Sequence, residues 1–178
     1  MIRTERLVIR PLVLSDTDAL LPYHSDPEVV RYIPWTVRDR VEVMAYIKRV
    51  ATAFDPTTQG SYLMMGFTRS DDDTVIGQVN AGMESVSDNH ASIGWVINPE
   101  YSGQGFTTEA VRGLLAYLIE ECGIRRFTAK IDQRNDGSIE LAKRLGMRLE
   151  ATYVEDEFFK GEWVSTCLYA ILDREVQR

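Results

Sequence analysis

The segment 93–110 carries the pattern in this chain that points most directly to chemistry. It reads IGWVINPEYSGQGFTTEA, in which an apolar run leads to a proline turn, two glycines (Gly103 and Gly105) and the start of a helical pattern. Glycines allow a tight loop and let backbone N–H groups approach a ligand closely. The first N–H groups of a helix lack internal partners, and the helix dipole adds partial positive charge. The pattern therefore predicts a phosphate-binding loop that needs no charged side chain.

A plain turn between a strand and a helix is the simpler interpretation of the same glycines. Two better-known phosphate loops do not match the segment. The chain has no GxxxxGK[ST] sequence, and Thr108 stands where a GxGxxG fingerprint would need its third glycine. These differences argue against a nucleotide hydrolase and against a nicotinamide-dependent oxidoreductase.

Asn135 and Ser138 form a second block of interest, at the start of a predicted helix over 138–145. Because Asn and Ser are favoured at helix starts, both capping and ligand contact are open interpretations for them. Cys122 is expected to be a small apolar filler, and His90 in a polar turn is expected to be inert. Since no His, Cys or Asp cluster has metal-ligand spacing, we expect no metal.

The segment 93–110 resembles the coenzyme A-binding motif of the GCN5-related N-acetyltransferase (GNAT) superfamily, [Q/R]-x-x-G-x-[G/A]. The longer run NPEYSGQGFTTEAVRGLLAYL looks like the ribosomal-protein N-terminal acetyltransferase (RimJ/RimL-like) branch. Other similar blocks are TERLVIRPL, SDPEVVRYIPW, the NDGS of 135–138 with LAKRLGM, and GEWVSTCLYAIL. Two positions depart from the motif: Ser102 stands where Gln or Arg is usual, and Thr107 replaces the final small residue.

The resemblance implies an enzyme that moves an acetyl group from acetyl-CoA directly to a primary amine. It implies Ser138 as the proton donor to the departing thiolate, and Glu157 as the general base nineteen residues later. Strand alternation would put Glu155 and Glu157 on one face. His24 is a second candidate base near the acceptor, and Tyr32 and Trp35 are expected to line the acceptor cleft. The residues implied to bind the cofactor are Trp95, Val96, Ile97, Ser102, Gly103, Gln104, Gly105, Phe106, Thr107, Thr108, Asn135 and Ser138.

Apolar periodicity predicts the elements that must position these residues. We expect short helices within 15–34 and over 138–145, and longer ones over 39–54 and 107–121. We expect strands over 7–10, 62–67, 75–79, 91–97, 126–131, 149–159 and 162–172. This order predicts an α/β (α+β) fold, and the resemblance implies the GNAT fold: a mixed, mostly antiparallel twisted sheet of about seven strands with helices on both faces. Residues 1–178 are expected to form a single domain.

Composition narrows the classes of partner. The 178 residues include 20 Lys and Arg against 27 Asp and Glu, for a net charge of −7, which argues against direct binding to nucleic acid. No apolar run approaches the ~18 residues of a membrane span, and the N-terminus does not read as a signal peptide. With 2 cysteines and no CxxC pair, we expect a cytoplasmic protein that is a monomer or a homodimer.

The charges are unevenly distributed near the C-terminus. Residues 125–148 carry a net charge of +4, and residues 150–162 carry −4. We expect the first window to surround the cofactor, and the second to attract a cationic acceptor such as a basic protein N-terminus or a polyamine. The acceptor itself stays open between a protein N-terminal amine and a small amine. The alternative function is a non-catalytic acyl-CoA sensor or scaffold.

Overall fold

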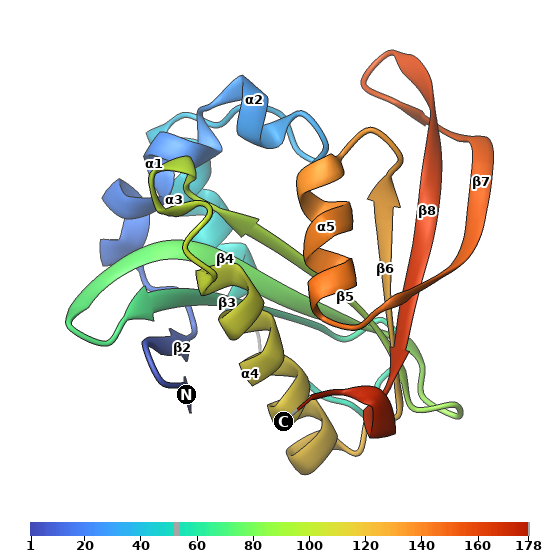
Figure 1. Ribbon diagram of the computed structural model, residues 1–178. Coiled ribbons are helices and arrows are strands. Elements are labelled where there is room, and N and C mark those ends of the chain that lie inside the picture. Colours follow the sequence, from blue (N-terminus) through green and yellow to red (C-terminus); the bar gives the residue numbers. More distant parts are fainter. Residues whose placement is uncertain (52–53, 178) are drawn as a thin grey trace.

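The computed structural model describes residues 1–51 and 54–177, and its strands form one eight-stranded sheet in the order β1-β2-β3-β4-β5-β6-β8-β7 (Figure 1). Neighbouring strands pair antiparallel, except for the parallel pair β5 and β6. The strands are β1 (Ile2–Arg3), β2 (Leu7–Arg10), β3 (Tyr62–Arg69), β4 (Asp72–Ser85), β5 (His90–Ile97), β6 (Arg126–Asp132), β7 (Arg148–Phe159) and β8 (Glu162–Leu172).

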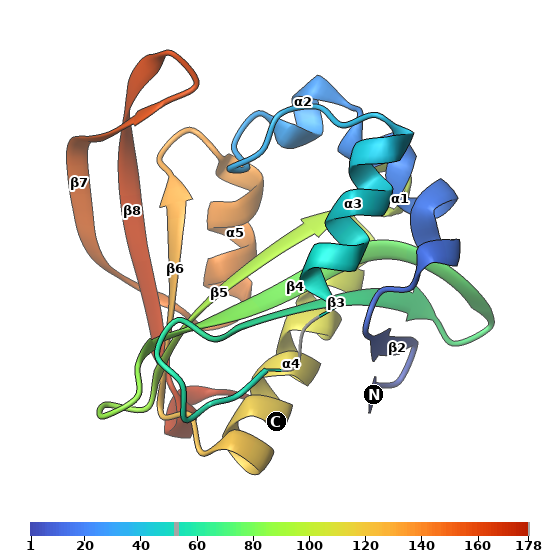
Figure 2. The same ribbon diagram turned by 180° about the vertical axis from the view of Figure 1, so that it is seen from behind.

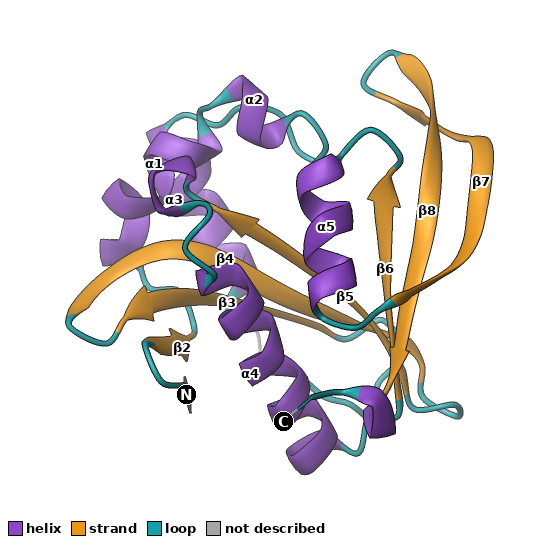
Figure 3. Ribbon diagram, viewed as in Figure 1, coloured by secondary structure: helices purple, strands orange, loops and turns teal. Residues whose placement is uncertain are grey.

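Helices cover both faces of this sheet (Figure 3). They are α1 (Thr17–His24), α2 (Pro27–Val30), α3 (Arg40–Val50), α4 (Phe106–Cys122) and α5 (Asp136–Arg144). The larger core cluster packs α4 and α5 against the sheet, with Leu114 and Leu141 among its buried members. The smaller cluster packs α1 and α3 on the opposite face, as Leu20 and Ile47 do (Figures 1 and 2).

The mixed, mostly antiparallel sheet with helices on both faces is confirmed. Eight strands replace the expected seven or so, because Ile2–Arg3 adds a two-residue edge strand beside β2. The helix expected over 39–54 begins at Arg40 and ends at Val50, and its predicted extension reaches residues 52–53, which lie outside the described residues.

The strands β5 and β6 are paired at one end only. Their register runs from His90 opposite Arg126 to Ser92 opposite Thr128, and within the described chain no pairing continues beyond that. Figures 1 and 2 show the two strands splaying apart from this point. As a result, the edge of β5 from Ile93 to Ile97 that faces β6 has no strand neighbour, although β5 stays paired with β4 on its other side.

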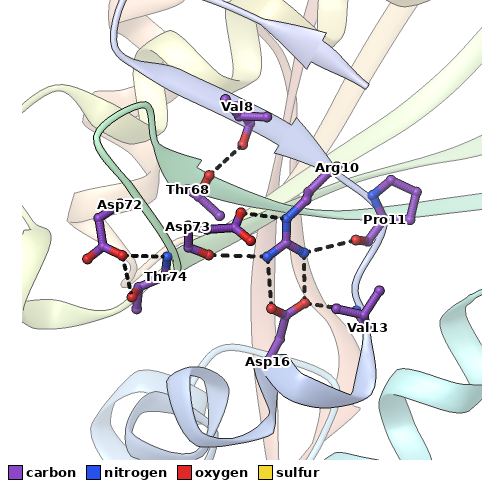
Figure 4. Close-up of polar contacts among 9 residues, drawn as sticks. All are labelled: Val8, Arg10, Pro11, Val13, Asp16, Thr68, Asp72, Asp73 and Thr74. Carbon is purple, nitrogen blue, oxygen red and sulfur yellow. Dashed lines mark hydrogen bonds and ion pairs between the residues drawn. The ribbon is translucent and has the colours of Figure 1, made fainter.

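An ion-pair network fixes the start of α1 on the sheet (Figure 4). The Arg10 guanidinium donates to both carboxylate oxygens of Asp16 at 2.8 and 2.9 Å, and its Nε donates to Asp73 at 3.0 Å. The Asp16 carboxylate also accepts from the Val13 backbone N–H at 2.8 Å. These bonds raise the pKa of Arg10. Because the Arg10–Asp16 fork is bidentate and largely buried, it holds α1 against β2 more firmly than a surface pair would.

None of the helices in residues 1–51 and 54–177 is both long enough and apolar enough to cross a membrane.

Candidate active site

The predicted phosphate loop connects β5 to α4. Asn98 turns the chain at the end of β5, where its side chain accepts from the Glu100 N–H at 3.1 Å. A short 3-10 helix (Pro99–Tyr101) follows. Gly103 and Gly105 then take φ angles of +75° and +81°, in the left-handed region that residues with a Cβ atom rarely adopt. The loop geometry therefore explains why both positions are glycine.

The N-terminus of α4 has no side-chain cap, in contrast to those of α2, α3 and α5. The side chains of Asp39 and Asn135 accept from backbone N–H groups at the starts of α3 and α5. At α4 the N-cap is Gly105, which offers no side-chain cap. The first-turn N–H groups of a 17-residue helix consequently face the loop without an internal acceptor, and such groups bind anions.

Arg6 ties this loop to the β1–β2 turn. Its Nε donates to Glu109 at 2.7 Å, its guanidinium donates to the Gln104 carbonyl at 3.1 Å, and its carbon Cζ lies 4.7 Å from the centre of the Phe106 ring. Glu109 also accepts from the Thr4 hydroxyl at 2.6 Å. Although partial burial opposes the effect, these bonds keep the pKa of Glu109 below its usual value. The network holds the loop in place and sets a cation beside it.

A cavity of about 1310 Å³ opens over the loop. Typical small-ligand sites measure about 300–1,000 Å³, so this one has room for a large cofactor. Every residue expected to bind the cofactor lines it except Gln104, whose backbone carbonyl is engaged by Arg6. The cavity also takes in residues for which the sequence suggested no role: Arg6, Glu109, Arg112 and Arg144.

A second cavity of about 680 Å³ lies between the splayed strands. Its walls come from β5, from β6 and from the segment after α2, with Ile93, Lys130 and Trp35 as examples. Tyr32 lines both cavities and Trp35 lines the second, so the structure brings these two predicted residues together at one opening.

The two cavities meet at Trp95 and Ser138, which line both of them. The indole Nε1–H of Trp95 donates to the Ser138 hydroxyl at 3.2 Å. Asn135 also lines both cavities, and its side chain accepts from the Ser138 backbone N–H at 3.1 Å. Asn135 therefore caps α5 and faces the junction at the same time, so the two interpretations left open by the sequence are compatible.

His24 does not line either cavity. It is fully buried, with Nε2 2.6 Å from the Gln78 side-chain oxygen and Nδ1 3.2 Å from an Arg38 nitrogen. A neutral ring that donates from Nε2 and accepts at Nδ1 satisfies both contacts. Burial lowers the pKa of His24 to about 4, although the bond with Gln78 acts in the opposite direction. This position does not support the predicted contact with the acceptor. Instead, His24 orients Arg38, which does line the second cavity.

Glu157 lies on β7, an edge strand separated from β5 by β8 and β6, and it lines neither cavity. The strand-face argument for it fails, because a bulge between Tyr153 and Glu157 interrupts the alternation. At this bulge Glu155 takes a φ of +47°, and Asp156 accepts from the Thr166 backbone N–H at 3.1 Å. The role of Glu157 as a base stays a prediction.

The charged residues of the two windows, 125–148 and 150–162, do not lie around the two cavities as we predicted. Within 125–148, Arg144 lines the first cavity but Lys130 lines the second. Within 150–162, Glu150 is neutralised by Arg126 and Glu162 by Arg134. Among the described residues, no acidic side chain of 150–162 lines either cavity.

Two cavities that meet at a shared polar junction define a protein able to bring two substrates together. The chain belongs to the acetyltransferase (GNAT) domain family, whose sequence model matches residues 6–148.

Three related proteins support this placement. The chain is 30% identical to the uncharacterized N-acetyltransferase p20 of Bacillus licheniformis, over 97% of this chain and 96% of that protein. It is 28% identical to the ribosomal-protein-serine acetyltransferase of Escherichia coli over 58% of this chain and 59% of that protein, in agreement with the RimJ/RimL-like resemblance. A GNAT-family acetyltransferase structure from Bacillus anthracis superposes with a TM-score of 0.87 at 26% identity, covering 98% of this chain and 99% of that one. The chain is therefore an N-acetyltransferase.

Proposed function

We propose that this N-acetyltransferase uses acetyl-CoA as donor and transfers the acetyl group directly to a primary amine held in the second cavity. One observation carries the proposal: the cavity built on the phosphate loop and the cavity between the splayed strands share Trp95 and Ser138. Direct transfer needs the donor and the acceptor to be bound together with their reacting groups adjacent. A shared junction provides that arrangement.

The first cavity fits the donor. Acetyl-CoA supplies an acetyl group activated as a thioester, and its phosphates need several hydrogen-bond donors. The uncapped first turn of α4 and the loop at Gly103 and Gly105 present backbone N–H groups, and Arg112 and Arg144 add positive charge. Arg6 adds no free charge, because it is paired with Glu109. The unpaired edge of β5 over 95–97 offers backbone groups at the junction, where negative charge on a carbonyl oxygen would need a donor.

We assign to Ser138 the role of proton donor to the departing thiolate. A thiol has an unperturbed pKa of ~8.5, so the departing thiolate takes up a proton near neutral pH, and a hydroxyl beside it can give that proton and regain one from solvent. The Trp95 indole donates to the Ser138 oxygen, which leaves the hydroxyl proton free to point elsewhere. The Asn135 cap fixes the backbone at this position.

The general base is the role with the least geometric support. Glu157 stays our prediction from the family resemblance, and it lies outside both cavities. Turnover of Glu157→Gln should fall most at low pH, where the amine is most protonated. Glu155→Gln, on the same bulge, serves as the control. A rate for Glu157→Gln that matches the parent enzyme across the pH range would remove Glu157 from the mechanism.

The acceptor class divides into protein N-terminal amines and small amines. The name of the Escherichia coli relative specifies a protein serine, which favours the first class. The alternative of a non-catalytic acyl-CoA sensor is separated by one assay, in which the protein, acetyl-CoA and a panel of amines are mixed and thiol release is followed. Binding of coenzyme A without thiol release for any amine would refute the proposed function.

We further propose that residues 1–178 act as one domain in the cytoplasm, as a monomer or a homodimer. One continuous sheet contains strands from both ends of the chain. Both cysteines, Cys122 and Cys167, are free thiols, which suits a reducing compartment.

A further inference from the structure

We infer that the acceptor amine carries an anionic group, a carboxylate or a phosphate, which binds at Arg38, Arg49 and Lys130 while the amine lies at the Trp95–Ser138 junction. This inference rests on the proposed function and specifies its acceptor. It opposes the cationic acceptor that the charge windows suggested.

The charges that line the second cavity favour an anion. Three basic side chains face it: Arg38, Arg49 and Lys130. Asp132 is the single acid among its described lining residues, and it is already bound by Arg134, with contacts of 2.8 and 3.0 Å. A second protonated amine in this cavity would meet three cations and no free carboxylate, which is unfavourable.

Arg38 is the clearest case of a cation in this cavity without an ion-pair partner, although the Glu42 carboxylate acts on it at longer range. Its guanidinium carbon lies 4.5 Å from the Trp35 ring and 4.2 Å from the Tyr46 ring, and the His24 contact orients it from behind. Among the described residues it forms no ion pair, and neither do Arg49 and Lys130. Burial lowers the pKa of Arg38. Partly buried charges are normally paired in folded proteins, so an anionic ligand would supply the absent partner.

A buried network keeps Arg38 in this place. His24 contacts both Arg38 and Gln78, and the Gln78 amide donates to the Tyr46 hydroxyl at 2.8 Å. Gln78 and Tyr46 both line the second cavity as well. An oriented guanidinium that rests against two neighbouring aromatic rings loses little side-chain freedom when it binds a carboxylate or phosphate in its planar fork. The wall is therefore preorganised for an oxyanion.

Matched peptides test the inference. Acetylation of Ser-Asp-Ala, Ser-Asn-Ala and Ser-Lys-Ala, each with an amidated C-terminus so that only the second side chain differs in charge, is compared at low ionic strength. O-phosphoethanolamine is compared with ethanolamine to distinguish a peptide carboxylate from a small phosphate. We expect kcat/KM to be about tenfold higher for the anionic member of a pair than for the neutral one, and lowest for the lysine peptide. The preference should shrink as salt rises, because partly exposed charges are screened.

Charge variants locate the effect. Arg49→Gln and Lys130→Gln should each reduce the anionic preference about threefold, since both side chains are exposed. Lys48→Gln is the matched control: it removes the same charge from the neighbouring position of α3 but lies outside both cavities, so it should leave the preference unchanged. Equal losses for Lys48→Gln and Arg49→Gln would overturn the inference.

The outcomes separate this inference from the proposed function. Rapid thiol release with the lysine peptide, together with no advantage for either anionic substrate, overturns the inference and leaves the acetyltransferase intact. Calorimetric binding of the N-acetylated peptides gives a readout that needs no turnover. There too, tighter binding of the aspartate peptide supports the inference, and equal binding overturns it.

Discussion

The two cavities are built by different means. The first is made chiefly by backbone, because the glycine loop and the uncapped turn of α4 present N–H groups that belong to no side chain. The second is made by side chains from several separate segments, with Trp35, Tyr46 and Lys130 among them. A backbone site tolerates many side chains as long as its dihedral angles are kept, whereas a side-chain site changes its ligand with each substitution. We infer that the first cavity fixes the donor and the second sets the acceptor.

The largest expected effect tests the backbone side of this comparison. Gly105→Val should lower kcat/KM for acetyl-CoA about 1,000-fold, because a β-branched residue cannot hold a φ of +81° and several charge-assisted hydrogen bonds would be lost. Gly60→Val is the control, since Gly60 has a φ of +77° but lines neither cavity. Steady-state kinetics and melting temperatures distinguish strain from loss of the site. A parent-like KM in Gly105→Val would disprove the placement of the donor.

A smaller effect is expected at the junction. Ser138→Ala should lower kcat about 100-fold with little change in the KM for acetyl-CoA, because a proton donor to the leaving group acts in the transition state. Ser92→Ala, on β5 outside both cavities, should leave kcat unchanged. If Ser138→Ala kept the parent kcat, then Ser138 would only support the start of α5.

Acid stability tests the buried His24, which contacts Arg38 and Gln78 of the second cavity. The folded state lowers the pKa of His24 to about 4, so the unfolded chain binds a proton there at a higher pH than the folded one does. Stability is therefore retained above about pH 6.5 and lost as the pH falls toward 4, by about 2 kcal/mol from this group. Denaturant titrations at pH 7 and pH 4.5 should show a smaller loss for His24→Gln than for the parent. His90→Gln, which changes the other histidine, should keep most of the loss; equal losses in all three proteins would argue against the buried neutral ring.

The smallest effect concerns the side-chain support of the backbone site. Arg6→Met should raise the KM for acetyl-CoA about tenfold and leave kcat nearly unchanged, since Arg6 bonds the loop through Glu109 and Gln104. Arg3→Met removes an equal charge from the exposed β1 strand as the control. A KM change of the same size in both variants would indicate a general charge effect, not support of the loop.

The sequence predicted a helix, strand or loop correctly where a few neighbouring residues fix that element. The strand-to-helix glycine loop and the apolar stripe of α4 occur as expected, and of the two interpretations left open for Asn135 the helix cap is present, since each depends on a few neighbouring residues. The alternation argument at Glu155 and Glu157 failed because a bulge depends on the pairing of β7 with β8, which a single strand does not reveal. The two-residue strand β1 is too short to produce a periodic signal.

Contacts between side chains distant in sequence were the part of the site that the sequence did not predict. Arg6 and Glu109 meet across 103 positions, and His24 and Gln78 across 54, so no local spacing relates them. A signal for Arg6 was present in the TERLVIRPL block, but it had no assigned role until the structure set it against the loop. Arg38 and Lys130 belong to no motif that would have indicated a role for them.

The sequence by itself determined the family, the donor loop and the order of elements, because these depend on backbone preferences and on apolar periods that neighbouring residues encode. Only the tertiary structure decided which charged side chains line the second cavity. Which charges form ion pairs depends on contacts between segments distant in sequence. Glu150 and Glu162 are paired with arginines, whereas Arg38 and Lys130 line the second cavity without a carboxylate partner among the described residues. The summed charge of a window counts all of these residues equally, whereas a ligand meets only those that the fold leaves unpaired.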